Sequence, residues 1–360
     1  MTEINEQRLL NTFFDLIRIY SPSGRERNVR AYIQDYLSDL SLDYKIDDFG
    51  NLIIYLPGKG ESIVYLAHMD NVEPCNNVDP VVENGIIKSR GKTILGADMK
   101  AGIAAILEAV KHLKENNLEH RTVEMVFTRE EEIGLKGAQR LNFNLLKSKK
   151  AVLFDGVGPL GSIAQKEAGA SIVEISIKGK ASHSGVIEKG AVSAIKIAGE
   201  IISSLPFGKA RESTNFDIGL ISGGQSVNTI AEKARMKGVI RSLNPAQEKV
   251  LMEEIAAKVK RIAANHGVSA NVKLKEVAGY HAISPISGLV KSIIVNMKGL
   301  DIKPSFYDDM SSSEASVLSK KGIEAVNLGY GGEKDHTIEE KIKVEDLILM
   351  TKLLINISKC

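Results

Sequence analysis

The stretch Thr93-Ile-Leu-Gly-Ala-Asp98-Met-Lys-Ala-Gly102 joins a turn-forming Gly-Ala-Asp to a long segment of apolar residues. In that segment apolar residues recur at helical spacing and would bury one face of a helix, at Ile103, Ile106, Leu107, Val110 and Leu113. Asp98 therefore stands at the start of a predicted helix. A carboxylate there is often a simple helix N-cap, so this segment alone leaves two interpretations open, a cap or a ligand.

Four other segments share a design in which an apolar, strand-like run ends abruptly in a residue able to bind a metal. They are Ile63 to Ala67 before His68 and Asp70, Val123 to Thr128 before Glu130-Glu131-Glu132, Ala151 to Phe154 before Asp155, and Ala325 to Leu328 before a glycine-rich turn and His336. Parallel strands point their C-terminal ends at one edge of a sheet, so these side chains should converge. One Asp between two sets of nitrogen and oxygen ligands is what a pair of divalent cations requires.

Length and composition describe an ordinary globular protein. The chain has 360 residues, which favours two domains, and 43% of them are hydrophobic, with 47 basic against 45 acidic residues. This balance indicates no nucleic-acid partner and no membrane surface. Cys75 and Cys360 are too few for a disulfide framework. The beginning of the sequence lacks a signal-peptide pattern and no apolar run approaches ~20 residues, so we expect a cytoplasmic protein.

The order of predicted elements indicates an α/β protein with a doubly wound, mostly parallel sheet. Helices are expected over 8–20 and 25–40, a hairpin over 44–56, and alternating strands and helices from 63 to 155. The pattern resumes near residue 277, with helices over 285–297, 312–321 and 344–358 and a strand at 325–328.

Between these parts the pattern changes. Strands over 172–178, 216–221, 234–240 and 270–277, with helices over 190–204 and 245–265, give β-α-β-β-α-β, a ferredoxin-like α+β arrangement. The expected organisation is therefore a first domain in two parts, 1–168 and 277–360, with an inserted domain over 169–276.

His68 and Asp70 are weak evidence on their own, because a buried histidine bonded to a carboxylate is common in structural roles. The pair nevertheless suits a metal, since a ligating imidazole usually donates its other ring N–H to a carboxylate or carbonyl. Asp70 would then orient His68 and not bind the ion.

The acidic run Glu130-Glu131-Glu132 would ordinarily be a solvated face. It follows an apolar strand, however, and precedes Ile133-Gly-Leu-Lys-Gly137, a tight turn into a helix. Adjacent carboxylates at a strand end project differently, so one can bind metal while the other accepts a proton from metal-bound water.

Together these motifs resemble the family of di-zinc exopeptidases and deacylases that includes peptidase T, glutamate carboxypeptidase and aminoacylase. The motifs are Ala67-His-Met-Asp70, Gly96-Ala-Asp-Met-Lys-Ala-Gly102, Glu131-Glu-Ile-Gly134, Phe154-Asp-Gly156 and Asp335-His336-Thr. Gly-Ala-Asp and Glu-Glu-Ile-Gly look most similar to the peptidase T branch, and the likeness covers nearly the whole chain.

The resemblance implies a role for each residue of the two-cation site. Asp98 would bridge two Zn2+ ions, for which Co2+ or Mn2+ could substitute. His68 and Asp155 would complete one ion, and Glu132 and His336 the other. The catalytic residues would be Glu131, as general base, and Asp70, as the orienter of His68.

It also implies that the inserted domain is a lid that binds substrate and forms a homodimer. His183, within Gly179-Lys-Ala-Ser-His183-Ser-Gly185, would reach the substrate carbonyl, and Asn228 and Arg241 would hold the carbonyl or a substrate carboxylate. Each has a plainer alternative, as a surface loop histidine, a turn residue and an exposed strand-end charge. An Arg fork does suit a carboxylate.

The sequence departs from the family pattern at Ser311-Ser-Ser-Glu314-Ala315, where the family carries Gly-Gly-Ser/Thr-Asp-Ala. This segment borders the substrate site, so it bears on the choice of substrate and not on metal binding.

The leading hypothesis is a zinc-dependent hydrolase that cleaves a terminal amide bond of short peptides through a metal-bridging hydroxide. An N-acyl amino acid deacylase or carboxypeptidase of the same family is the alternative within this chemistry. A non-catalytic metal-binding or scaffold protein descended from such enzymes would have lost Glu131 or a ligand, and this chain keeps them all.

Overall fold

The computed structural model describes residues 3–186 and 190–359, and Cys360 lies outside them. The chain divides into two compact units. The first contains Met1–Lys166, His281–Asp309 and Ser313–Cys360, and the second contains Glu167–Tyr280 and Met310–Ser312. Each unit has hydrophobic clusters of its own.

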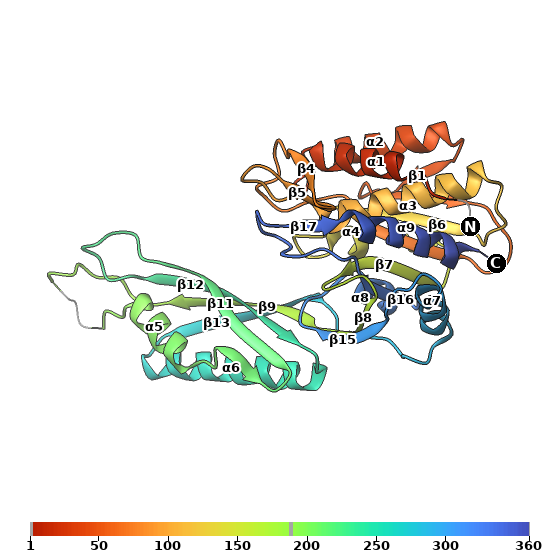
Figure 1. The fold of residues 1–360 in the computed structure, drawn as a ribbon. Coiled ribbons are helices and arrows are strands. Elements are labelled where there is room, and N and C mark those ends of the chain that lie inside the picture. The colour runs from red at the N-terminus through yellow and green to blue at the C-terminus, as the bar shows by residue number, and fades with distance from the viewer. Residues whose placement is uncertain (1–2, 187–189, 360) are drawn as a thin grey trace. The chain divides into compact units, whose positions relative to one another are not determined.

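The first unit is built on a mixed sheet whose strand order is β1-β2-β6-β3-β7-β16-β8-β14, with β15 paired to β8 (Figure 1). The four central strands, β6, β3, β7 and β16, are parallel, and antiparallel strands flank them on both sides. The strands are β1 (Tyr44–Ile46), β2 (Leu52–Leu56), β3 (Ile63–His68), β6 (Val123–Thr128), β7 (Lys150–Gly156), β8 (Ser162–Glu167), β14 (His281–Ala282), β15 (Ser305–Asp309) and β16 (Glu324–Gly329).

Helices cover both faces of this sheet, which explains why its central strands are apolar throughout. In β3, Ile63 and Tyr65 face one hydrophobic cluster while Val64 and Leu66 face another. The first cluster is completed by α1 (Glu6–Arg18), α2 (Arg27–Asp39), α3 (Ala97–Glu115), α7 (Gly288–Lys298) and α9 (Val344–Ser358). The short α8 (Ala315–Lys320) contributes to the second cluster, and α4 (Lys136–Gln139) packs beside it.

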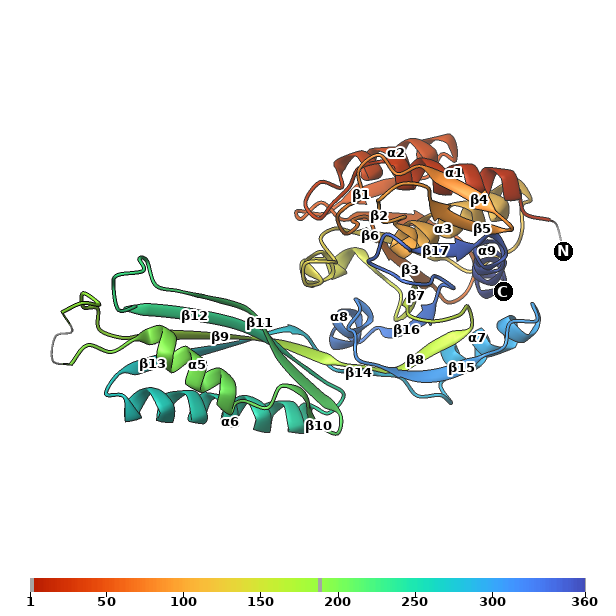
Figure 2. The ribbon, with the colours of Figure 1, turned by 60° about the vertical axis from the view of Figure 1, so that its left-hand side comes forward.

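A small three-stranded sheet in the first unit was not predicted. It has the order β17-β5-β4, from β4 (Pro80–Glu83), β5 (Ile86–Ser89) and β17 (Lys341–Lys343) (Figure 2). Two of its strands form a hairpin and the third comes from far along the chain. Its strands are only three or four residues long, too short for an alternating apolar pattern to be visible in the sequence.

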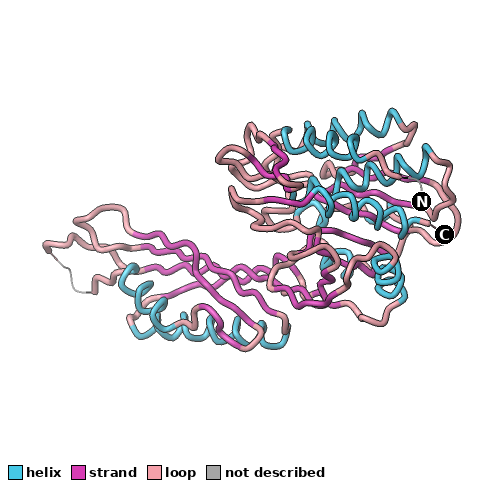
Figure 3. Tube along the Cα trace, viewed as in Figure 1, coloured by secondary structure: helices cyan, strands magenta, loops and turns pink. Residues whose placement is uncertain are grey.

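The second unit is a five-stranded antiparallel sheet with the order β10-β11-β12-β9-β13. Both of its helices lie on one face of the sheet (Figure 3), where they close a single apolar cluster. Its elements are β9 (Gly169–Lys178), α5 (Ala194–Ser204), β10 (Gly208–Arg211), β11 (Thr214–Gly223), β12 (Lys233–Ser242), α6 (Pro245–Asn265) and β13 (Ser269–Ala278).

The predicted fold class is confirmed, with local differences. All six predicted elements of the inserted domain are present, but β10 was missed because it is short, polar and paired only with β11 at the sheet edge. The helix predicted from 190 begins at Ala194, because the Ser193 side chain caps it by accepting the Lys196 N–H. The helix predicted from 312 begins at Ala315. Among the described residues, no helix has the length and apolar character needed to cross a membrane.

Candidate metal centre

The parallel strands bring the predicted ligands to one edge of the first unit's sheet. His68 is the last residue of β3, Asp155 lies near the end of β7, and Glu131 and Glu132 follow β6. Three groups have ligand atoms that all lie within 4.8 Å of one another: His68 with Asp98 and Asp155, His68 with Glu131 and Glu132, and Asp98 with Glu132 and His336. All six residues belong to the same unit.

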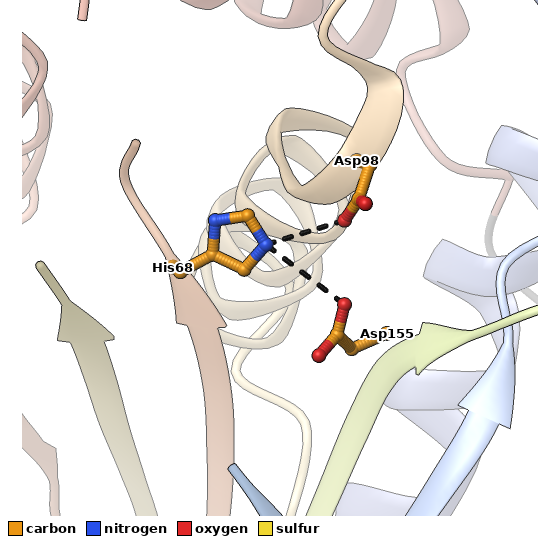
Figure 4. A group of neighbouring side chains, drawn as sticks. All are labelled: His68, Asp98 and Asp155. Carbon is orange, nitrogen blue, oxygen red and sulfur yellow. Dashed lines mark hydrogen bonds and ion pairs between the residues drawn. The ribbon is translucent and has the colours of Figure 1, made fainter. Parts of the chain in front are cut away.

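Asp98 lies between two sets of side chains. Its Oδ1 is 3.2 Å from His68 Nε2, and its Oδ2 is 3.3 Å from His336 Nε2. His68 Nε2 is also 3.8 Å from Asp155 Oδ1 (Figure 4), and His336 Nε2 is 3.2 Å from Glu132 Oε2. The two oxygens of one carboxylate therefore face two separate ligand pairs, which is the geometry of a bridging ligand.

The backbone around Asp98 explains how its side chain leaves the helix. Gly96 has φ +81°, a left-handed conformation that glycine tolerates, and Asp98 itself is non-helical, with φ −75° and ψ 109°. Buried Glu340 accepts the N–H groups of Gly96 at 2.6 Å and of Asp98 at 3.1 Å. Both Asp98 oxygens face histidines and not helix amides, so the N-cap interpretation is wrong.

Asp70 fixes the orientation of His68. The Nδ1 atom of His68 lies 3.2 Å from the Asp70 carbonyl oxygen and 3.5 Å from its Oδ1, so Nδ1–H is the donor and Nε2 is free to bind a metal. The Asp70 carboxylate also accepts the backbone N–H groups of Glu131 at 3.0 Å and Glu132 at 3.2 Å. It thus links the histidine to the acidic turn.

The electrostatics are those of a site built for cations. Burial raises the pKa of Glu131 and of Asp155 well above the ordinary value, and neighbouring carboxylates raise both further. Burial would lower the pKa of His68, but its hydrogen bonds to carboxylates outweigh this and raise it. Hydrogen bonds to Asp98 and Glu132 raise the pKa of His336 to about 11. A bound cation would relieve this crowding of negative charge.

The residues present fit divalent cations. Glu132 Oε1 is buried and has no hydrogen-bond partner among the described residues, as expected for an oxygen reserved for a metal. The donors are imidazole nitrogens and carboxylate oxygens, with no thiolate among them. Such a set suits zinc, and also cobalt or manganese.

The proposed substrate-binding residues belong to the second unit, and the structure brings only two of them together. His183 and Asn228 are both exposed, and the N–H of Ser184 donates to the Asn228 carbonyl at 2.9 Å. An isolated bridge also pairs His183 with Thr229. The chain around His183 and the chain around Asn228 therefore lie side by side near Lys233, the first residue of β12.

Arg241 lies at the other end of β12, eight residues further on, or about 26 Å at ~3.3 Å per residue. Its Nη1 donates to the Met310 carbonyl at 3.4 Å. A short substrate could not touch both ends of this strand at once.

Sequence reasoning missed three buried carboxylates near the candidate metal centre: Glu26, Glu314 and Glu340. Each is followed or preceded by polar residues in a loop, so no apolar pattern distinguished them. Glu314 lies in the segment noted above only as a departure from the family pattern. Its carboxylate accepts a hydrogen bond from the hydroxyl of Thr128 at 2.9 Å, and Thr128 is the last residue of β6, just before the turn that carries Glu131.

Glu314 leads to a prediction about pH. Burial raises its pKa from 4.5 to about 7, so between these values the folded state keeps a proton that the unfolded chain has lost. The raised pKa contributes its full stabilisation of the folded state below pH 4.5. This contribution is lost as the pH rises through 7, which lowers the free energy of unfolding by about 3 kcal/mol. Urea unfolding of metal-free protein should therefore show Glu314→Gln gaining stability over the wild type on going from pH 5 to pH 8.

The exposed Glu253 supplies the control, because Glu253→Gln should follow the wild type at both pH values. An equal difference between wild type and Glu314→Gln at pH 5 and pH 8 would contradict the prediction.

Comparison with known proteins agrees with this geometry. The model of Peptidase family M20/M25/M40 matches residues 64–359. The chain is 35% identical to the uncharacterized protein YqjE of Bacillus subtilis over 366 aligned residues, covering 98% of each chain. It superposes on the crystal structure of a tripeptidase from Staphylococcus aureus with a TM-score of 0.93 and 32% identity, covering 99% of this chain and 98% of that one.

A second solved structure, aminopeptidase PepT from Bacillus cereus, gives a TM-score of 0.89 and 31% identity, with 99% of this chain and 98% of that one covered. The family match spans most of the chain and includes the cluster of side chains that could hold a metal ion. The chain belongs to peptidase family M20/M25/M40, within its peptidase T-like branch, and is a metallopeptidase.

Proposed function

We propose that the protein is an exopeptidase that uses two zinc ions to hydrolyse a terminal amide bond of short peptides. One observation carries the proposal: the two oxygens of Asp98 lie 3.2 Å and 3.3 Å from histidines of two different ligand sets. The similarity to a tripeptidase and to an aminopeptidase supports short peptides as the substrate class.

Asp98 would be shared between the two ions. His68 and Asp155 would hold one ion, and Glu132 and His336 would hold the other. When bound, the ions supply Lewis acidity, which lowers the pKa of water and polarises the substrate carbonyl.

Glu131 is the general base in this proposal. It is 9% exposed and lies in one cluster with His68 and Glu132, so it is close to the residues that would hold the ions. Its carboxylate takes a proton from the attacking water and delivers it to the leaving amine. Asp70 keeps the base in place through the Glu131 backbone N–H.

An assay of purified protein tests this proposal directly. With zinc or cobalt added, it should hydrolyse di- and tripeptides with a free amino terminus faster than N-acetyl amino acids. Faster release of acetate from N-acetyl amino acids would establish the deacylase alternative, and no hydrolysis of either class would refute the proposed function.

Arg241 is proposed to receive a substrate carboxylate. No carboxylate within the described part of the chain forms an ion pair with it, and an Arg fork matches a carboxylate in two parallel hydrogen bonds. Arg241→Ala should raise KM by about 10-fold or more for tripeptides with a free C-terminus, because a charged hydrogen bond contributes roughly 1.5–3 kcal/mol. Zinc content and melting temperature should not change.

C-terminally amidated tripeptides are the control, since they lack the charge that Arg241 would bind. Equal losses with free and amidated peptides would show that Arg241 does not recognise the carboxylate. His183 and Asn228 lie near the start of β12, away from Arg241, and need a separate test. If His183→Ala showed wild-type kinetics, this pair of residues would not belong to the substrate site.

The inserted domain is also proposed as the dimer interface. β10 and β13 are the edges of its sheet, and β13 extends over 10 residues, Ser269–Ala278, which makes it a suitable template for pairing with a second copy. Light scattering after size exclusion should give twice the chain mass of 39.1 kDa, and a proline at exposed Lys273 should shift it to the monomer. A cytoplasmic location, compatible with the free buried thiol of Cys75, completes the proposal.

A further inference from the structure

The turn that carries the general base has an unusual backbone. We call residues 129–135, between β6 and α4, the Glu131 turn. Glu130 and Leu135 both have positive φ, at +51° and +55°, although neither is glycine. Such conformations persist only where surrounding contacts hold them. Something must therefore fix this turn besides its own hydrogen bonds.

Two buried carboxylates hold three consecutive amides of the turn. Asp70 accepts the N–H groups of Glu131 and Glu132. Glu26 accepts the N–H of Glu130 at 3.1 Å through Oε1. Asp70 and Glu26 are both fully buried, at 0% exposure. The backbone N–H groups of Glu130, Glu131 and Glu132 thus all donate to buried carboxylates.

Glu26 also anchors the side chain at the start of the turn. Arg129 Nε donates to Glu26 Oε2 at 2.8 Å, and Arg129 Nη1 donates to the Phe49 carbonyl at 2.8 Å. Glu26 is the N-cap residue of α2, yet its side chain makes no cap hydrogen bond. Its carboxylate is directed instead to the Glu131 turn.

The loop between α1 and α2 supplies the support for both carboxylates. Ser23 Oγ donates to Asp70 Oδ2 at 2.6 Å, and the N–H of Gly24 donates to Glu26 Oε1 at 2.6 Å. Ser23, Gly24 and Glu26 lie about a hundred residues before the Glu131 turn in the sequence, so only the fold brings them to it.

We infer that Glu26 is a positioning residue for the reaction, which acts through the Glu131 turn. By holding the Glu130 N–H and the Arg129 side chain, Glu26 sets where the Glu131 carboxylate and the Glu132 ligand point. This inference rests on the proposed function for the roles of Glu131 and Glu132. Glu26 belongs to none of the three groups of candidate ligands among the described residues. Its loss should therefore change geometry at the site without removing any group that does chemistry.

Glu26→Gln is the primary variant. A neutral amide oxygen can still accept one N–H, but its NH2 group would oppose Arg129. Outer partners of metal ligands typically contribute 10–100-fold to affinity or activity, so we expect kcat to fall by about that factor with KM nearly unchanged. In a titration followed by cobalt absorption, the weaker of the two Co2+ sites should lose about 10-fold in affinity. Glu26→Asp, which keeps the charge, should recover part of both losses.

The chain offers a closely matched control in Glu108. Arg8 Nε lies 2.7 Å from its Oε2, with side-chain exposures of 23% and 0%, against 22% and 0% for Arg129 and Glu26. Glu108 also accepts a backbone N–H, from Asn5 at 3.3 Å, and within the described residues no hydrogen bond or ion pair joins it to the metal centre. Glu108→Gln should lower the melting temperature as much as Glu26→Gln while leaving kcat and the cobalt titration unchanged.

If Glu26→Gln does not fold, Arg129→Lys tests the same contact, because Lys keeps the charge but loses the fork that spans Glu26 and Phe49. Wild-type kcat and cobalt affinity in a folded Glu26 variant would overturn the inference and leave a purely structural ion pair. The proposed function and this inference can fail independently. If the wild type did not hydrolyse peptides, the proposed function would fail, but the cobalt titration would still compare the metal affinity of Glu26→Gln with that of Glu108→Gln.

Discussion

Replacement of Glu131 by Gln should lower kcat by about 10²–10⁴-fold while both metal ions remain bound, because general-base catalysis typically contributes this factor. The substitution is nearly isosteric and leaves the backbone N–H of residue 131 on Asp70. It removes only the ability to accept a proton. KM should change little, since the substrate would still meet the same ions. Steady-state kinetics and elemental analysis on the same sample measure both quantities.

The neighbouring residue provides the control. Glu132→Gln should lose one ion, because Glu132 Oε2 lies 3.2 Å from His336 Nε2 and its Oε1 has no other partner within the described residues. If Glu131→Gln lost metal while Glu132→Gln kept it, the two roles would have to be exchanged. Both glutamates lie in one cluster with His68, so this pair of variants assigns the two roles.

The sequence predicted the fold class because its central strands are buried on both faces. Runs such as Ile63 to Ala67 can only be apolar throughout if helices cover both sides of the sheet. The same rule predicted that side chains at the ends of parallel strands converge, and the structure places His68 and Asp155 side by side. The chemical roles of these residues remain predictions.

The short edge elements and the support of the site could not be predicted. β10 and the β4–β5 hairpin are too short for a periodic pattern. Glu26 and Glu340 accept hydrogen bonds from backbone N–H groups of residues far away in the sequence. In the sequence, an isolated Glu in a polar loop looks the same whether it is solvated or buried. Burial of such groups depends on tertiary contacts, which no local pattern encodes.

The separation of Arg241 from His183 depends on strand pairing. Arg241 pairs with Ala170 near the start of β9, whereas His183 follows the end of β9, where Lys178 pairs with Lys233. The resemblance assigned both to substrate binding, while the structure makes them alternatives for any one short substrate bound to a single copy of this unit.

Loss of Asp98, the carboxylate proposed to bridge the two ions, should be more severe than loss of any other proposed ligand. Asp98→Asn should bind neither ion tightly and should show no measurable turnover, because both ligand sets share this residue. Asp155→Asn and Glu132→Gln should each retain about one ion. Metal content after dialysis, measured per chain, should therefore be near zero, one and one, against two in the wild type. The exposed Asp79, whose carboxylate forms an ion pair with Arg90, gives a neutral control as Asp79→Asn.

Stability supplies a second measure that does not depend on turnover. An ion present at 1,000 times its Kd stabilises the folded state by about 4 kcal/mol, so zinc should raise the melting temperature of the wild type strongly and that of Asp98→Asn hardly at all. Chelation should remove this gain together with activity, and added zinc or cobalt should restore both. Full activity in wild-type protein shown to be free of metal would exclude the two-zinc mechanism. Retention of one ion by Asp98→Asn would instead show that one ligand pair binds without the bridge, and comparison with Asp155→Asn would then identify that pair.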